Sequence, residues 1–125
     1  MVSKLEALAD AIASLNEYHA PESRAYQIRN PGMLRAFTLR HPRTKDGYRI
    51  FEYAVDGYQA LLYDLRQKCS GESRSKLKVD DNVESLLLRG YSQPPSAAEY
   101  VLCFLQNALP NKVAAGTPLK FFIEG

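Results

Sequence analysis

The sequence predicts an α+β fold, a mainly helical domain with a small β-hairpin after its first helix. Apolar residues recur at helical spacing in several separate segments. One short stretch reads instead as two strands joined by an Asp-Gly turn. A length of 125 residues is that of one domain, so residues 1–125 are expected to form a single unit.

The first helix is expected over residues 4–16. Ser3 and Glu6 form a Ser-x-x-Glu capping box at its start. Apolar residues then lie on one face of the helix, at Leu5, Leu8, Ile12 and Leu15. Glu17 follows directly, where the helix runs out. Prolines and a glycine punctuate the next stretch, so residues 18–33 are predicted to be a loop.

The two predicted strands cover residues 34–39 and 48–53, and Asp46-Gly47 marks the turn between them. Basic residues gather on this hairpin, at Arg35, Arg40, Arg43, Lys45 and Arg49. They are typical of a surface for an anionic polymer or a nucleic acid. Charges at a hairpin tip more often serve solubility, which is the interpretation favoured here.

Four further elements follow. A second helix is expected over residues 54–68, and Gly57 inside it marks a close approach by another segment. A polar loop leads to a short helix that begins near Asp81 and ends at Gly90. An apolar helix over residues 97–109 is predicted to be the most buried element. The apolar tail, residues 119–123, is expected to dock on the core as a strand or extended segment.

Composition narrows the possible function classes. The net charge of +2 gives only weak attraction to a polyanion. No His, Cys, Asp or Glu set has metal-ligand spacing, and no glycine-rich phosphate loop occurs, so neither a metal nor a cofactor is expected. Cys69 and Cys103 are predicted to be unbonded, with Cys103 a small core residue. The N-terminus does not read as a secretory signal, and no run reaches the length of a membrane span.

Several short motifs follow one another along the chain in a characteristic order. They are Glu17 at a helix end, Pro21-Glu22-Ser23, the Asn30-Pro31-Gly32 turn, Gly57 near a helix start, Tyr91, Pro94-Pro95, Tyr100 and Thr117-Pro118-Leu119. This order and spacing resembles the lysozyme-like superfamily. The match is to the phage and bacterial cell-wall lysins, whose first helix ends in a catalytic Glu and is followed by an Asn-Asn-Pro-Gly-Asn-type turn. The resemblance spans most of the chain and implies a lysozyme-like domain.

The resemblance implies a glycosidase that cleaves peptidoglycan, either a muramidase (a hydrolase) or a lytic transglycosylase. Glu17 would be the single general acid/base, since it falls on the catalytic Glu of the family. Considered without the family, Glu17 is a solvated residue at a helix end. Candidate substrate-binding residues are Asn30, Tyr91 and Tyr100. Alternatively, Asn30 forms a local turn bond and the two tyrosines lie at the edge of the core.

The sequence also departs from the family pattern. In the family, a small residue follows the catalytic Glu, but here that position is Tyr18. Arg29 and Met33 occupy the positions of the two asparagines that flank the Asn-Pro-Gly turn in the family. These departures favour a second hypothesis, a catalytically degenerate lysozyme-like protein that serves as a phage structural part or binds the cell wall. Under either hypothesis the partner is a peptidoglycan glycan strand and not a nucleic acid. The chain would be cytoplasmic as synthesised and act on the wall after release or as part of a virion. The sequence leaves the oligomeric state open.

Overall fold

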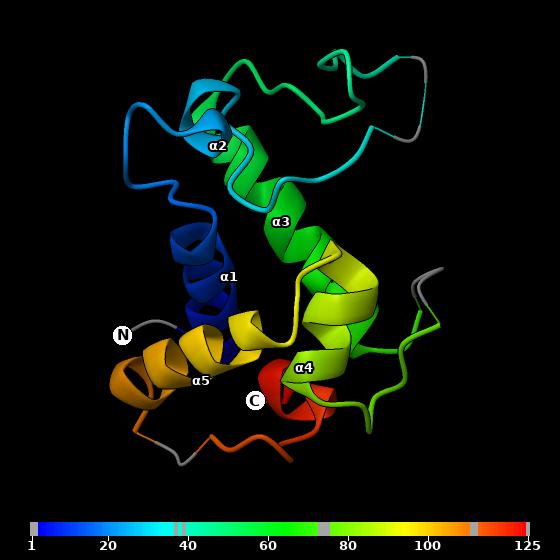
Figure 1. Cartoon of the computed structure of the whole chain (residues 1–125). Helices are drawn as coiled ribbons and strands as arrows, with labels where there is room; N and C mark the ends of the chain where they lie inside the picture. Colours follow the sequence, from blue (N-terminus) through cyan, green and yellow to red (C-terminus); the bar gives the residue numbers. More distant parts are fainter. Residues whose placement is uncertain (1–2, 37, 39, 73–75, 111–112, 125) are drawn as a thin grey trace.

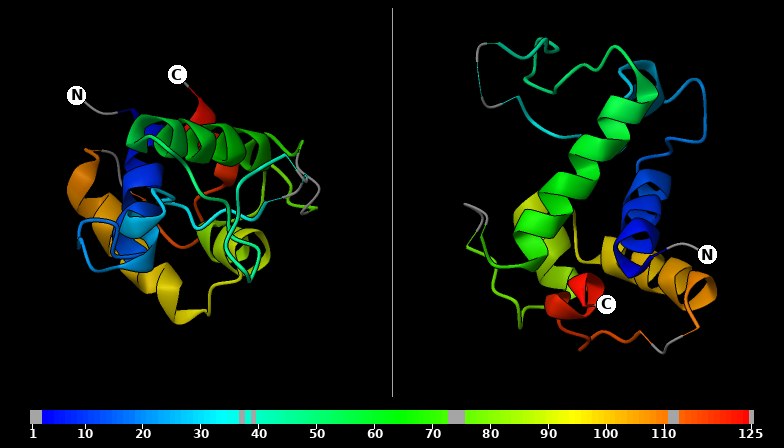
Figure 2. Two further views of the ribbon diagram at one scale, coloured as in Figure 1. Left: turned by 90° about the horizontal axis from the view of Figure 1, so that it is seen from above. Right: turned by 180° about the vertical axis from the view of Figure 1, so that it is seen from behind.

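The computed structural model describes residues 3–36, 38, 40–72, 76–110 and 113–124, and it is mostly helical. In chain order the elements are α1 (Lys4–Leu15), α2 (Arg24–Gln27), α3 (Ala54–Cys69), α4 (Val83–Ser85), the π-helical turn η1 (Leu86–Gly90), α5 (Ser96–Ala108) and the 3-10 helix η2 (Leu119–Ile123) (Figure 1). Helix α1 packs on α5, α3 and η2. Helix α2 and the long loop after it lie at one end of α3, and α5, η1 and η2 lie towards the other (Figure 2).

Helix α1 begins as the sequence predicts. The Glu6 backbone N–H donates to Ser3 Oγ over 3.0 Å, and the Ser3 N–H donates to Glu6 Oε1 over 3.1 Å. These hydrogen bonds lower the pKa of Glu6. Half of the helix is buried, at Leu5, Ala7, Leu8, Ala9, Ala11 and Ile12. Its alanines allow close contact with neighbours on more than one side.

The prediction that residues 97–109 form the most buried element is wrong. Helix α5 buries one stripe, made of Ala97, Ala98, Val101 and Leu105. The opposite face, with Tyr100 and Cys103, is exposed, because α5 lies at the outside of the helical assembly. Cys103 is therefore not a core residue. It and the buried Cys69 are both free thiols, as expected, and burial raises the pKa of Cys69 to about 12.

The predicted β-hairpin, and with it the α+β class, is wrong. The described residues contain no β-strand, only isolated antiparallel bridges between Arg35 and Tyr48 and between Arg43 and Arg49. Two positions of the first predicted strand, 37 and 39, lie outside the described residues. The segment is an irregular loop whose two halves touch at a few backbone hydrogen bonds.

Side-chain hydrogen bonds hold much of this irregular loop in place. Asn30 is fully buried, and its Nδ2 donates to the carbonyl oxygens of Leu34 (3.0 Å) and Arg49 (2.9 Å). Its Oδ1 accepts the Leu34 N–H over 2.8 Å. Arg35 Nη1 donates to the Asp46 carbonyl over 2.6 Å. Backbone bonds between the two halves are few, such as those from the Arg49 N–H to the Leu34 carbonyl and from the Ala36 N–H to the Gly47 carbonyl, and these side chains supplement them.

Helix α3 matches its prediction to within one residue, and Gly57 marks the expected close approach. A Cβ atom at Gly57 would lie 1.9 Å from the Arg29 carbonyl oxygen. The tail docks on the core as predicted, with Leu119 and Phe122 buried, but as a 3-10 helix and not as a strand or extended segment. Among the described residues, no helix is long and apolar enough to cross a membrane.

Candidate functional site

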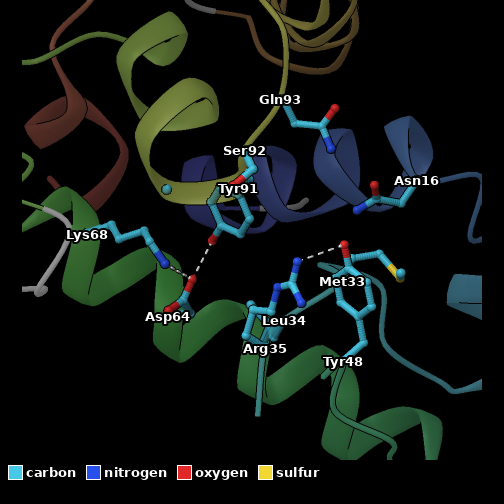
Figure 3. Close-up of a pocket in the computed structure, with 11 residues that line it drawn as sticks. Asn16, Met33, Leu34, Arg35, Tyr48, Asp64, Lys68, Tyr91, Ser92 and Gln93 are labelled. Carbon is cyan, nitrogen blue, oxygen red and sulfur yellow. Dashed lines mark hydrogen bonds and ion pairs between the residues drawn. The ribbon is translucent and has the colours of Figure 1, made fainter. Parts of the chain in front are cut away.

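A cleft of about 240 Å³ opens between the end of α1, the irregular loop and the segment after η1 (Figure 3). Its lining comes from four parts of the chain: Asn16; Met33, Leu34, Arg35 and Tyr48; Asp64 and Lys68 of α3; and Gly90, Tyr91, Ser92 and Gln93. The lining combines polar side chains and two tyrosines with the apolar Met33 and Leu34.

The backbone on both sides of Tyr91 has an irregular conformation, which sets the position of this residue. The π-helical turn η1 ends at Gly90, Tyr91 caps it with φ −132°, and Ser92 adopts φ +53°. The π-helical turn and the left-handed residue redirect the chain out of η1 and across the cleft. Short π-helical segments of this kind frequently occur at functional sites.

Tyr91, Asp64 and Lys68 form one network on the floor of the cleft. The Tyr91 hydroxyl donates to Asp64 Oδ2 over 2.7 Å, and Lys68 forms an ion pair with the same oxygen. Lys68 is only 7% exposed, and its Nζ lies 4.7 Å from the centre of the Tyr91 ring. Burial raises the pKa of Tyr91 well above its ordinary value, and the negative charge of Asp64 adds to this. The buried charges thus neutralise each other, and Tyr91 keeps its proton.

The opposite wall carries a stacked cation. The Arg35 guanidinium lies 4.3 Å from the centre of the Tyr48 ring, and that of Arg24 lies 5.2 Å from it. Arg24 also pairs with Asp46, whose pKa is held well below its usual range by that guanidinium and by the Thr44 hydroxyl. This wall is therefore ordered by cation–π and ion-pair contacts although it lacks a β-sheet.

Two amides in the cleft retain hydrogen-bonding capacity. Asn16 Nδ2 donates to the Pro31 carbonyl over 3.0 Å, which fixes the side chain and leaves its Oδ1 open. The Gln93 side chain makes no hydrogen bond to any described residue. An amide carries two donor hydrogens and an acceptor oxygen. The cleft can therefore bind a polar ligand without breaking internal contacts.

Two of the five described non-glycine residues with positive φ line this cleft. Met33 and Ser92 have φ values of +47° and +53°, in the left-handed region that favours glycine, and both line the cleft. A residue held there costs about 1–3 kcal/mol. The other three, Glu17, Arg29 and Lys76, lie outside the lining, so backbone strain does not by itself single out this cleft.

The structure leaves the sequence-predicted acid outside the cleft. Glu17 is exposed, with φ +58°, and does not belong to the described lining. Its carbonyl oxygen accepts the Ala20 N–H over 2.9 Å. The carboxylate makes no hydrogen bond or ion pair with a described residue. Its neighbour Asn16 does line the cleft, so Glu17 stands at the edge.

The three predicted substrate-binding residues are separated. Tyr91 lies in the cleft. Asn30 is fully buried, with its amide used to hold the loop. Tyr100 is 45% exposed on α5, outside the cleft lining, with its Oη 2.6 Å from Ser14 Oγ of α1.

Sequence reasoning missed Asp64 and Lys68. Their spacing of four residues within a predicted helix is a sequence signal, but it usually marks a solvated surface pair. What buries them is the segment after η1, which is distant in sequence. Gly90 contributes here, because a Cβ atom on it would lie 3.0 Å from Lys68 Cε.

The described residues hold no group of three or more His, Cys, Asp or Glu side chains placed to bind a metal ion. Comparison of the chain with protein-family models, with curated proteins and with solved structures gave no match.

Proposed function

We propose that this protein binds a glycan strand of peptidoglycan in the cleft beside Tyr91, as a lysozyme-like protein whose task is binding. The observation that carries the proposal is the chemistry of the cleft. Open amide groups and tyrosine rings face it, while its one carboxylate among the described lining residues, Asp64, is already bonded to Lys68 and Tyr91. Amides and tyrosines suit the hydroxyl and acetamido groups of sugars. The Asp64 Oδ2 atom already contacts both Lys68 and Tyr91.

A sedimentation assay with purified cell walls tests the proposal. Gln93→Ala removes an amide that has no internal partner, so binding should weaken roughly three- to tenfold with the fold unchanged. Gln93→Trp, which fills the cleft, should abolish binding. Gln59→Ala, on the exposed side of α3, is the matched control. Wild-type protein that stays in the supernatant would contradict the proposal.

A second candidate function is cleavage of the same strand, by hydrolysis or transglycosylation, with Glu17 as general acid/base. The observation that favours it is the position of Glu17 directly after Asn16, at the edge of the cleft. Exposure weighs against it, because an acid that must hold a proton near neutral pH is usually buried beside apolar groups.

Turbidity clearing of cell walls separates the two functions. If cleavage occurs, Glu17→Gln should slow it by about 10²–10⁴-fold, while Glu22→Gln, in the same loop, should leave it unchanged. If the protein only binds the wall, the wild type should not clear it, and Glu17→Gln should bind the wall as tightly as the wild type does. Clearing that depends on Glu17 would establish the second candidate.

A further inference from the structure

Charge is distributed very unevenly along this chain. Residues 24–49 contain seven Arg and Lys residues against one acid, Asp46, a net charge of +6. The whole chain carries only +2, so all other residues together carry −4. We call the seven cations the arginine lobe: Arg24, Arg29, Arg35, Arg40, Arg43, Lys45 and Arg49. Surface charge that serves only solubility mixes both signs, and this lobe does not.

The proportion of arginine to lysine also differs between the lobe and the rest of the chain. The arginine lobe has six Arg and one Lys, whereas the other residues of the chain have three Arg and six Lys. Lysine serves solubility as well as arginine does. Arginine differs because its planar guanidinium binds carboxylate and phosphate with two parallel hydrogen bonds. The composition of the lobe therefore indicates oxyanion recognition.

The structure leaves most of these cations accessible. All but Arg49 are exposed, and Arg29, Arg40 and Lys45 form no ion pair with a carboxylate among the described residues. Tyr48, with Arg35 on one side of its ring and Arg24 near it, limits the freedom of two guanidinium groups. Groups that are already ordered lose less conformational entropy when they bind a ligand.

The arginine lobe continues from the cleft. Arg35 belongs to both, and the cleft residue Tyr48 contacts Arg35 and Arg24 of the lobe through its ring. A polymer that occupies the cleft therefore meets the lobe on that wall (Figure 3). In peptidoglycan, every second sugar of the strand carries a peptide stem, and these stems end in carboxylates. Their charge complements the arginine lobe.

We propose that the arginine lobe binds the carboxylates of peptide stems on the glycan strand held in the cleft. This inference rests on the proposed function and adds a specificity to it. The protein should prefer glycan strands that carry stems over strands of equal length from which the stems have been removed.

Binding of the two kinds of strand, measured by calorimetry with wild type and variants, tests this specificity. Arg40→Gln/Lys45→Gln removes two exposed cations that form no ion pair with a described residue, and should weaken binding of the stem-bearing strand by roughly two- to thirtyfold. It should leave binding of the stripped strand unchanged. The matched control is Lys76→Gln/Lys78→Gln, two exposed lysines outside the lobe, which should change neither.

Salt gives an independent readout. The preference for the stem-bearing strand should fall between about 0.05 M and about 0.5 M sodium chloride, because exposed charges are screened. Equal binding of both strands by the wild type would overturn the inference and leave the proposed function standing, and binding of neither would remove both. Equal losses in the two double variants, or tighter binding of a single-stranded oligonucleotide than of the stem-bearing strand, would also overturn it.

Discussion

Gly57 lets α3 pack closely against the loop that forms one wall of the cleft. A Cβ atom at this position would stand 1.9 Å from the Arg29 carbonyl oxygen. In an exposed helix, Gly→Ala stabilises by about 1 kcal/mol. Here the overlap with backbone outweighs that gain, and Gly57→Ala should lower the free energy of unfolding by at least about 1–3 kcal/mol. Thermal unfolding measures the sign directly.

Gly116→Ala is the control for this experiment. Apart from its chain neighbours, no described residue has an atom within 4 Å of the Cβ that it would add, so its stability should stay close to that of the wild type. A Gly57→Ala variant as stable as the wild type would show that Arg29 does not approach the helix so closely.

Asn30 fixes the same wall through hydrogen bonds. It is fully buried and bonds the backbone of Leu34 and Arg49, so Asn30→Ala leaves buried polar groups without partners. The variant should lose at least about 1–3 kcal/mol of unfolding free energy in urea denaturation. Asn107→Ala, an exposed change on α5, should stay within about 0.5 kcal/mol of the wild type. Similar losses in both variants would contradict the role given to Asn30.

Among the elements, α5 offers a test of the core. Leu105 is fully buried in its inner stripe, and Leu105→Ala should cost about 2–5 kcal/mol. Leu88 in η1 is 51% exposed, so Leu88→Ala should cost far less. Urea denaturation of both variants checks the difference. A loss well under 1 kcal/mol for Leu105→Ala would mean that α5 does not pack as described.

The helices were predictable because their signals are local. The Ser3–Glu6 box sets the start of α1, and the apolar period of α3 follows from neighbouring residues. The irregular loop in place of a β-hairpin was not predictable, because a local pattern does not show that Asn30 and Arg35 will hold the loop with side-chain hydrogen bonds. Those partners lie across the loop and follow from the folded structure alone.

The candidate site was predictable only in part, for a similar reason. Tyr91 could be found from a motif, but the burial of Asp64 and Lys68 depends on a segment more than twenty residues away in sequence. Helix periodicity also predicted α5 as central, although only one of its faces is covered. Periodicity identifies the apolar face of a helix and does not tell how many neighbours will cover it.

For the protein as a whole, we expect the free energy of unfolding to fall at alkaline pH. Burial raises the pKa values of Tyr91, Tyr58 and Cys69 above their ordinary values. As pH rises, these groups lose their protons in the unfolded state first, so the unfolded state binds fewer protons and unfolding becomes easier. Their contribution to stability should therefore be intact below about pH 8 and fall above about pH 9–10.

Tyr91→Phe tests this dependence. It removes one titrating group, so the alkaline slope of the unfolding free energy should become shallower by up to about 1.4 kcal/mol per pH unit. Tyr63→Phe, at an exposed tyrosine of α3, should leave the slope unchanged. An unaltered slope in Tyr91→Phe would contradict the raised pKa of the cleft tyrosine.

The most direct test of glycan binding is an NMR titration of the wild-type protein with a tetrasaccharide of the peptidoglycan glycan strand. We expect the backbone amide signals of Asn16, Tyr48, Tyr91 and Gln93 to shift together and saturate with one dissociation constant. No shift at any concentration would contradict it. So would shifts confined to the groove beside Asp10, Tyr58 and Phe104 on the other side of α1.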